Sequence, residues 1–168
     1  MAVRLLPRTL PELYAHALVL ERDATARFEL FAKVMRDSGM DHLAEEFEAI
    51  GKEEREQYEL LSTGTANANL PEPAAWEYAW HFMGEGADVI RQPRTARDVL
   101  ALAISAERRV QNFYADVAEN VEDDAVSAFA SEMAIDESRH IERLERLLAR
   151  EPVPASVDDE ADTALGLR

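Results

Sequence analysis

Four long stretches of the chain place hydrophobic residues at helical spacing, and turn-forming residues separate them. At about 100° per residue, hydrophobic side chains three and four positions apart share one face of a helix. The first predicted helix begins after Thr9, which can form a capping box with Glu12, and Pro11 suits its first turn. This helix is expected to run to about Asp37, just before the helix-ending Gly39.

The other three helices are predicted from similar signals at their ends. Asp41 is a candidate N-cap for the second helix, and Thr95 opens the third within a box that Asp98 closes. The expected bounds are Asp41 to about Leu61, Thr95 to about Asn120, and Glu122 or Asp123 to Arg150. Each helix carries one hydrophobic face, which predicts an all-α protein.

The connections between the predicted helices differ in length. The first and third are short, which favours two antiparallel hairpins, whereas residues 62–94 form a long connection with three prolines. A long crossover between two helical hairpins is typical of the ferritin-like antiparallel four-helix bundle. We therefore expect the bundle in residues 1–150 and an acidic C-terminal tail in residues 151–168.

The composition excludes several classes of protein. The chain has no cysteine, so it has neither a disulfide framework nor a rubredoxin-type iron site. Its formal net charge of −16 disfavours nucleic acid and anionic lipid as partners. No stretch approaches the roughly 18 apolar residues of a membrane span, and the first residues lack an export signal. A cytoplasmic protein that does not enter a membrane is expected.

Polar residues interrupt the hydrophobic faces in a regular way. Each of the four helices carries one glutamate on its inward face, and the second and fourth helices each carry a further polar residue three positions later. These candidate site residues are Glu21, Glu54, Gln57, Glu107, Glu137 and His140.

The four glutamates also agree in height along the bundle. They lie 13 to 16 residues from the short connection of their own hairpin, which at about 1.5 Å per residue places them within about one turn of each other. Burying one unpaired carboxylate costs several kcal/mol in order of magnitude, and four together also repel one another. Two divalent cations would remove that conflict, so the pattern predicts a two-metal carboxylate site.

With these residues placed, the sequence resembles the rubrerythrin branch of the ferritin-like superfamily. That family carries a glutamate on the first and third helices and a Glu-x-x-His motif on the second and fourth. Glu137 and His140 form a complete motif, and Glu21 and Glu107 match the single glutamates. The resemblance covers residues 10–150 and is carried by four motifs in the correct order.

The sequence departs from the family pattern at three points. Gln57 stands where the second motif, which begins at Glu54, has histidine, and a neutral amide is a poorer iron ligand than imidazole. Val110 stands where classical rubrerythrins carry an additional glutamate. The absent cysteines mean that electrons would have to come from an external donor.

The resemblance implies a di-iron redox protein, with manganese or zinc as alternative metals. Glu21 and Glu107 would be terminal ligands, Glu54 and Glu137 would bridge the metals, and His140 would bind one of them. All five would act in catalysis through the metals, and Gln57 is a further candidate ligand. The implied activity is reduction of peroxide or oxidation of ferrous iron by dioxygen or peroxide.

Two other functions remain open on the sequence alone. The same residues could bind or store metal without turnover, or the chain could be a metal-free helical interaction module. Arg22, Arg108 and Arg139 lie beside the ligand candidates but one step around the helix, so they are expected to point elsewhere.

Further residues have two interpretations each. Tyr114 could hydrogen-bond a metal ligand or relay an electron, although core packing also explains it. His81 could replace the missing imidazole if the crossover folds over the site. The aromatic residues Trp76 and Trp80 are expected to pack on the bundle or to form a homodimer surface. Residues 165–168 faintly resemble the tags that direct ferritin-like cargo into encapsulin shells.

Overall fold

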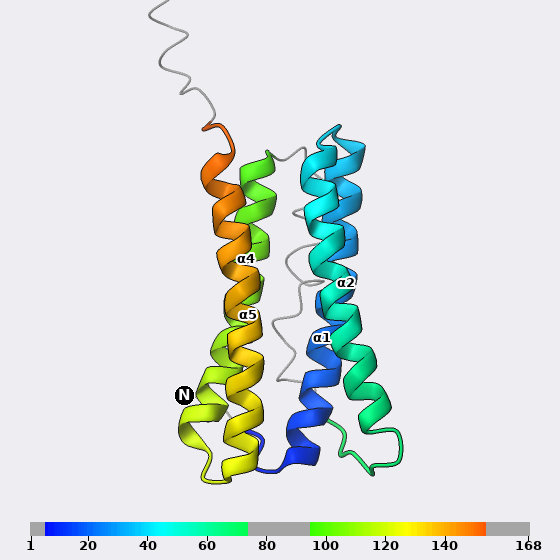
Figure 1. Cartoon of the computed structure of the whole chain (residues 1–168), viewed down its shortest axis with the longest axis vertical. Helices are drawn as coiled ribbons and strands as arrows, with labels where there is room; N and C mark the ends of the chain where they lie inside the picture. The colour runs from blue at the N-terminus through cyan, green and yellow to red at the C-terminus, as the bar shows by residue number, and fades with distance from the viewer. Residues whose placement is uncertain (1–5, 74–94, 154–168) are drawn as a thin grey trace, which may run out of the picture.

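The computed structural model describes residues 6–73 and 95–153, and the helices there account for almost all of them. These helices are α1 (Leu10–Asp37), α2 (Asp41–Gly64), α4 (Ala96–Asn120) and α5 (Asp124–Arg150). α1 packs along α2, and α4 packs along α5, so the four form two antiparallel hairpins (Figure 1). The expected all-α, ferritin-like four-helix bundle is confirmed.

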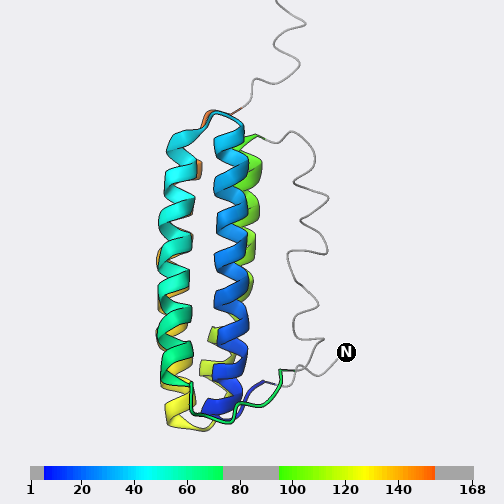
Figure 2. The ribbon, with the colours of Figure 1, turned by 90° about the vertical axis from the view of Figure 1, so that its right-hand side faces the viewer.

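The order of the helices in space requires a long crossover. α2 ends at one end of the bundle, and α4 begins at the other (Figures 1 and 2). The chain between them must therefore span the length of the bundle, which is the topology expected from the sequence. The aromatic stretch at residues 76–82, including His81, and residues 165–168 lie outside the described part of the chain.

Three of the predicted helix starts are confirmed by their capping bonds. The Thr9 hydroxyl accepts from the backbone N–H of Glu12 at 3.4 Å, and the Glu12 carboxylate accepts from the Thr9 N–H at 3.2 Å. Thr95 and Asp98 form the same reciprocal box at the start of α4. The carboxylate of Asp123 accepts from the backbone N–H groups of Ala125 and Val126, in the first turn of α5.

The predicted cap of α2 is wrong. Asp41 is the first residue of the helix, and Met40 is the N-cap residue without a side-chain cap bond. The tight turn explains this, because Gly39 has φ +76° and the Met40 N–H donates to the carbonyl of Met35 at 2.9 Å. Asp41 instead pairs with Arg36.

The predicted end of α2 at Leu61 is one turn too early. The helix continues to Gly64, and both the N–H and the hydroxyl of Thr65 donate to the carbonyl of Leu61. Serine and threonine side chains can satisfy backbone groups of a helix end, so the polar run at its C-terminus did not stop the helix.

Two hydrophobic clusters form the core, one toward each end of the bundle. The upper cluster in Figure 1 has buried members from all four helices, including Phe28, Phe47, Leu100 and Leu144. The lower cluster is built from α1, α4 and α5, and α2 adds only the partly buried Leu61. The polar residues predicted for the site lie between the two clusters.

One turn before Glu54, α1 and α2 pack closely together at Gly51. A Cβ atom at Gly51 would lie 3.0 Å from the Cβ of Phe28, so only glycine fits without a shift of the helices. Within the described residues, no helix has an apolar stretch long enough to cross a membrane.

Candidate metal centre

Four glutamates, one from each helix, are buried in the layer between the two hydrophobic clusters. Their exposed fractions are 1% for Glu21, 1% for Glu54, 0% for Glu107 and 3% for Glu137. Acidic side chains are almost never buried to this extent unless they are paired or bind metal. The four side chains therefore lie in one buried layer, as their shared face and height along the predicted helices indicated.

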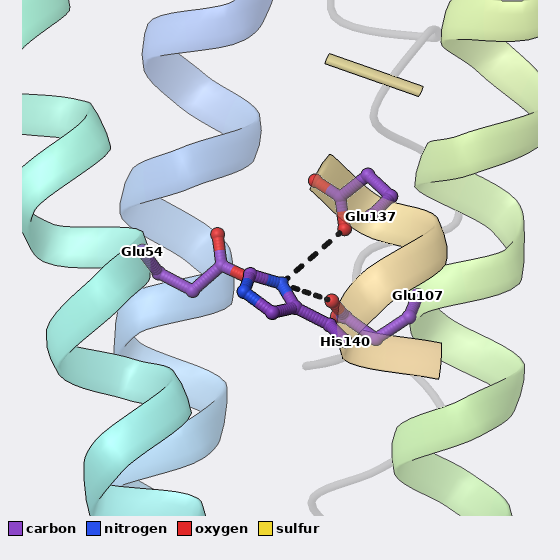
Figure 3. A group of neighbouring side chains, drawn as sticks. All are labelled: Glu54, Glu107, Glu137 and His140. Carbon is purple, nitrogen blue, oxygen red and sulfur yellow. Dashed lines mark ion pairs between the residues drawn. The ribbon is translucent and has the colours of Figure 1, made fainter. Parts of the chain in front are cut away.

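His140 brings three of these carboxylates together (Figure 3). Its Nδ1 atom lies 2.8 Å from an oxygen of Glu54, 3.6 Å from one of Glu107 and 4.0 Å from one of Glu137. One ligand atom from each of the four residues lies within 4.8 Å of all the others. Donors about 2.0–2.2 Å from a shared cation would be separated by about 3–4 Å, so a small inward movement of this group would form a single metal position.

The same four atoms lack hydrogen-bond partners. Within the described residues, the buried side-chain atoms without a partner are Arg27 Nε and one atom of each member of this group: Glu54 Oε1, Glu107 Oε2, Glu137 Oε2 and His140 Nδ1. The close approach of His140 to Glu54 does not have the geometry of a hydrogen bond. Leaving such atoms unpaired is costly, and a cation would satisfy all four at once, so the residues fit a bound metal ion.

Arg27 is a buried cation that the sequence analysis missed. Its side chain is 7% exposed, and its Nη2 atom donates to Glu107 Oε1 at 2.9 Å. The signal was present, because Leu20, Ala24 and Arg27 share the three-and-four spacing of a buried face. The prediction that Arg22, Arg108 and Arg139 point elsewhere is confirmed, since each pairs with an acid outside the buried layer.

Tyr114 holds the carboxylate on the opposite side of the layer. It is fully buried, and its hydroxyl donates to Glu21 Oε1 at 3.0 Å. The residue therefore packs in the core and also hydrogen-bonds a predicted ligand, so both interpretations of its position hold. The two hydrogen bonds cross between the same pair of helices. Arg27 of α1 donates to the glutamate of α4, and Tyr114 of α4 donates to the glutamate of α1.

Gln57 lies at the edge of the layer. It is half-buried, and its amide donates to the sulfur of Met133 at 3.4 Å. A pocket of about 130 Å³ reaches the site here, between α2 and α5. It is lined by Glu21, Glu53, Glu54, Gln57, Met133, Asp136, Glu137, Arg139 and His140. Gln57 thus lies beside the predicted ligands and lines the same pocket as Glu54 and His140.

A chain of charged groups holds the outer side of the His140 ring, and the sequence analysis did not find it. The Nε2 atom of His140 lies 3.1 Å from Glu53, whose other oxygen pairs with Arg143 at 3.1 Å. Arg143 also pairs with Glu46 at 2.8 Å. A carboxylate on the outer nitrogen of a metal-binding histidine orients the ring and directs its other nitrogen to the metal.

Burial and charge shift the pKa values of the site in opposite directions. Burial and the nearby Glu54 raise the pKa of both Glu21 and Glu137 well above the usual range. Burial would also raise the pKa of Glu107, but contact with His140 and the charge of Arg27 outweigh it and lower the pKa to about 2. Burial opposes a charged His140, yet Glu107 and Glu54 raise its pKa to about 11.

A bundle of two helical hairpins with this central layer of glutamates and one histidine defines a ferritin-like carboxylate protein. The sequence matches the model of the rubrerythrin family over residues 12–148. The chain therefore belongs to the rubrerythrin family.

A solved structure supports the fold. The chain is similar to an uncharacterized conserved protein from Magnetospirillum magnetotacticum MS-1, with a TM-score of 0.76 and 24% sequence identity. The match covers 89% of this chain and 99% of that one. No curated protein matches the sequence.

Proposed function

We propose that this protein is a di-iron carboxylate oxidoreductase that reduces peroxide or oxidises ferrous iron. The observation that carries the proposal is the set of four closely spaced, buried donor atoms without a hydrogen-bond partner, on Glu54, Glu107, Glu137 and His140. Three of these residues are hard anionic ligands, which suit iron and stabilise its oxidised state.

Different residues of the chain would bind each of the two ions. Glu107 and His140 would bind one ion, Glu21 and Gln57 would contribute to the other, and Glu54 and Glu137 would bridge them. When bound, a ferrous pair supplies one electron from each ion to peroxide or dioxygen. Family membership supports this division, because the rubrerythrin pattern has its ligands at these positions.

The other residues of the layer would keep the ligands in place. Arg27 and Tyr114 each hold one oxygen of a terminal carboxylate and leave the second oxygen to face the centre. The pocket beside Gln57 and Met133 would admit a small oxidant. Because the sequence has no cysteine, the electrons that restore the ferrous state would come from an external donor. Homodimerisation and loading into an encapsulin shell remain proposals from the sequence.

An anaerobic ferrous titration followed by hydrogen peroxide tests the proposal. We expect iron to bind and then to oxidise faster than it does in buffer, and Glu137→Ala to lose both properties. Glu132→Gln is the matched control, because Glu132 is an exposed glutamate of the same helix. No bound iron, or oxidation no faster than in buffer, would contradict the proposal. Anomalous scattering at the iron, manganese and zinc edges identifies the native metal.

Metal binding without turnover is the second candidate function, and Gln57 favours it. A neutral amide in place of imidazole weakens the ligand set of one ion. If the wild type binds metal but consumes peroxide at the same rate as Glu137→Ala, the protein is a binding or storage component.

A further inference from the structure

The centre has two chemically different halves that share Glu54 and Glu137. We call Glu107 and His140 the histidine half, and Glu21 and Gln57 the glutamine half. In a symmetric bundle the two halves would bind cations equally well. The contacts around each half in this chain differ, and these contacts determine how firmly each would hold a cation.

The histidine half is arranged as a complete cation position. Its two residues and the shared glutamates supply four donor atoms within 4.8 Å of one another, and none of the four has a hydrogen-bond partner among the described residues. Glu53 fixes the outer nitrogen of His140, so the ring is oriented before any ion arrives.

The glutamine half is less complete. The Gln57 amide group donates to Met133, and its neutral amide oxygen is a poorer metal ligand than the His140 imidazole. Glu21 does not belong to the group of four closely spaced donors. Both residues of this half line the open pocket, whereas in the histidine half His140 lines it and Glu107 does not, so more of the glutamine half is open to exchange with solvent.

Arg27 adds a charge effect that also opposes a second ion. Four carboxylates carry −4, and the buried guanidinium adds +1, which gives −3 when His140 is a neutral ligand. A first divalent cation changes this to −1, and a second changes it to +1. Without Arg27 the same two steps would run from −4 to −2 and then to 0. In a buried layer, where charges are weakly screened, Arg27 therefore weakens the attraction of both ions, and the charge of the first ion further weakens the attraction of the second.

We propose that the centre binds divalent cations in two unequal steps, the first tight and in the histidine half, the second weak and in the glutamine half. Gln57, and the position of Glu21 outside the group of closely spaced donors, cause the difference, whereas Arg27 opposes both steps. The inference rests on the proposed function in one respect, that the centre binds two metal ions. It holds whether or not the metal-loaded protein catalyses a redox reaction.

Calorimetric titration of the metal-stripped protein with cobalt(II) under anaerobic conditions tests the inference without redox chemistry. We expect two binding steps whose dissociation constants differ by about a hundredfold or more, since ligand and charge effects each contribute about tenfold. Cobalt absorption, recorded along the same titration, reports the change of ligands between the two steps.

Matched variants assign the steps to the two halves. Gln57→His should tighten the second step about tenfold and leave the first unchanged, whereas His140→Gln should weaken the first. Arg27→Met should tighten both steps, and Arg27→Lys, which keeps the charge, should bind as the wild type does. Circular dichroism of each metal-free variant checks that the bundle is folded. Arg27→Gln replaces Arg27→Met if that variant does not fold.

The outcomes separate this inference from the proposed function. Two equal steps in the wild type, or a second step unchanged by both Gln57→His and loss of the Arg27 charge, would overturn the inference alone. Two unequal steps without peroxide turnover would support it and overturn only the redox activity. No cobalt binding at all would overturn both.

Discussion

The two terminal carboxylates of the centre are held by different kinds of donor. Glu107 pairs with the buried cation Arg27, whereas Glu21 accepts from the neutral hydroxyl of Tyr114. The pKa of Glu107 is lowered to about 2, and that of Glu21 is raised well above its usual range. Two glutamates at matched positions on a near-symmetric scaffold thus have pKa values shifted in opposite directions before metal binds, because the groups around them differ.

This comparison shows that burial alone does not set the chemistry of the layer. Both carboxylates are almost fully buried, so desolvation opposes ionisation of each to a similar extent. Contact with His140 and the charge of Arg27 overcome that penalty for Glu107, whereas the Tyr114 hydroxyl does not overcome it for Glu21, which Glu54 also repels. The consequences can be tested by removing or exchanging these partners.

Removing Arg27 should have the largest effect. Arg27→Met leaves the Glu107 carboxylate without its cation in a buried layer, so we expect the metal-free protein to lose about 3–5 kcal/mol of unfolding free energy. Urea unfolding of the metal-stripped protein measures the change. Arg108→Met is the control, because Arg108 pairs with Glu145 at the surface, and it should cost under about 1 kcal/mol. Equal losses in the two variants would contradict the role given to Arg27.

Replacing a shared carboxylate should have the opposite effect on stability. In Glu137→Leu, a buried acid that other glutamates repel gives way to an apolar side chain of similar volume. We expect the metal-free protein to gain about 2 kcal/mol and to lose cation binding in both halves. Urea unfolding and cobalt titration of the same samples check the two parts. A destabilised metal-free variant would show that Glu137 stabilises the fold instead of opposing it.

Cation binding should strengthen as pH rises. The pKa values of Glu21 and Glu137 are raised, and that of His140 is raised to about 11, so the metal-free centre holds protons near neutral pH. A cation must displace them, and each proton released makes the affinity rise about tenfold per pH unit, or about 1.4 kcal/mol. Glu107, with a pKa of about 2, releases none in this range.

Titrations between about pH 6 and pH 8, in buffers of different ionisation enthalpy, count the protons. More than one proton should accompany the first step, because Glu137 and His140 both serve the histidine half. An affinity independent of pH would show that the metal-free centre is already deprotonated.

Tyr114→Phe should have the smallest effect, and only in the glutamine half. The variant removes one hydrogen bond from Glu21 and keeps the buried ring, so we expect a loss of about 1 kcal/mol in the metal-free protein. The second cobalt step should change by less than about tenfold, and the first should not change. A weaker first step would mean that Tyr114 acts on the histidine half as well.

Local sequence signals were sufficient for most of the fold. Capping residues such as Thr9, Thr95 and Asp123 mark helix starts because the bonds they make involve neighbours within three residues. Hydrophobic periodicity placed the four glutamates on buried faces for the same reason, since the direction of a side chain follows from its position along the helix. The start and end of α2 were misplaced where a tight turn and a polar run overrode these signals.

Contacts between helices could not be obtained in this way. Which oxygen of Glu107 meets Arg27, whether Tyr114 reaches Glu21, and which acid holds the outer nitrogen of His140 all depend on how the two hairpins pack. Long side chains from distant positions reach the same point only after packing sets the distances between helix axes. The sequence by itself thus determined four helices and a buried layer of acids, whereas the tertiary structure alone decided the direction in which the pKa values of Glu21, Glu107 and Glu137 shift, because each depends on partners from other helices.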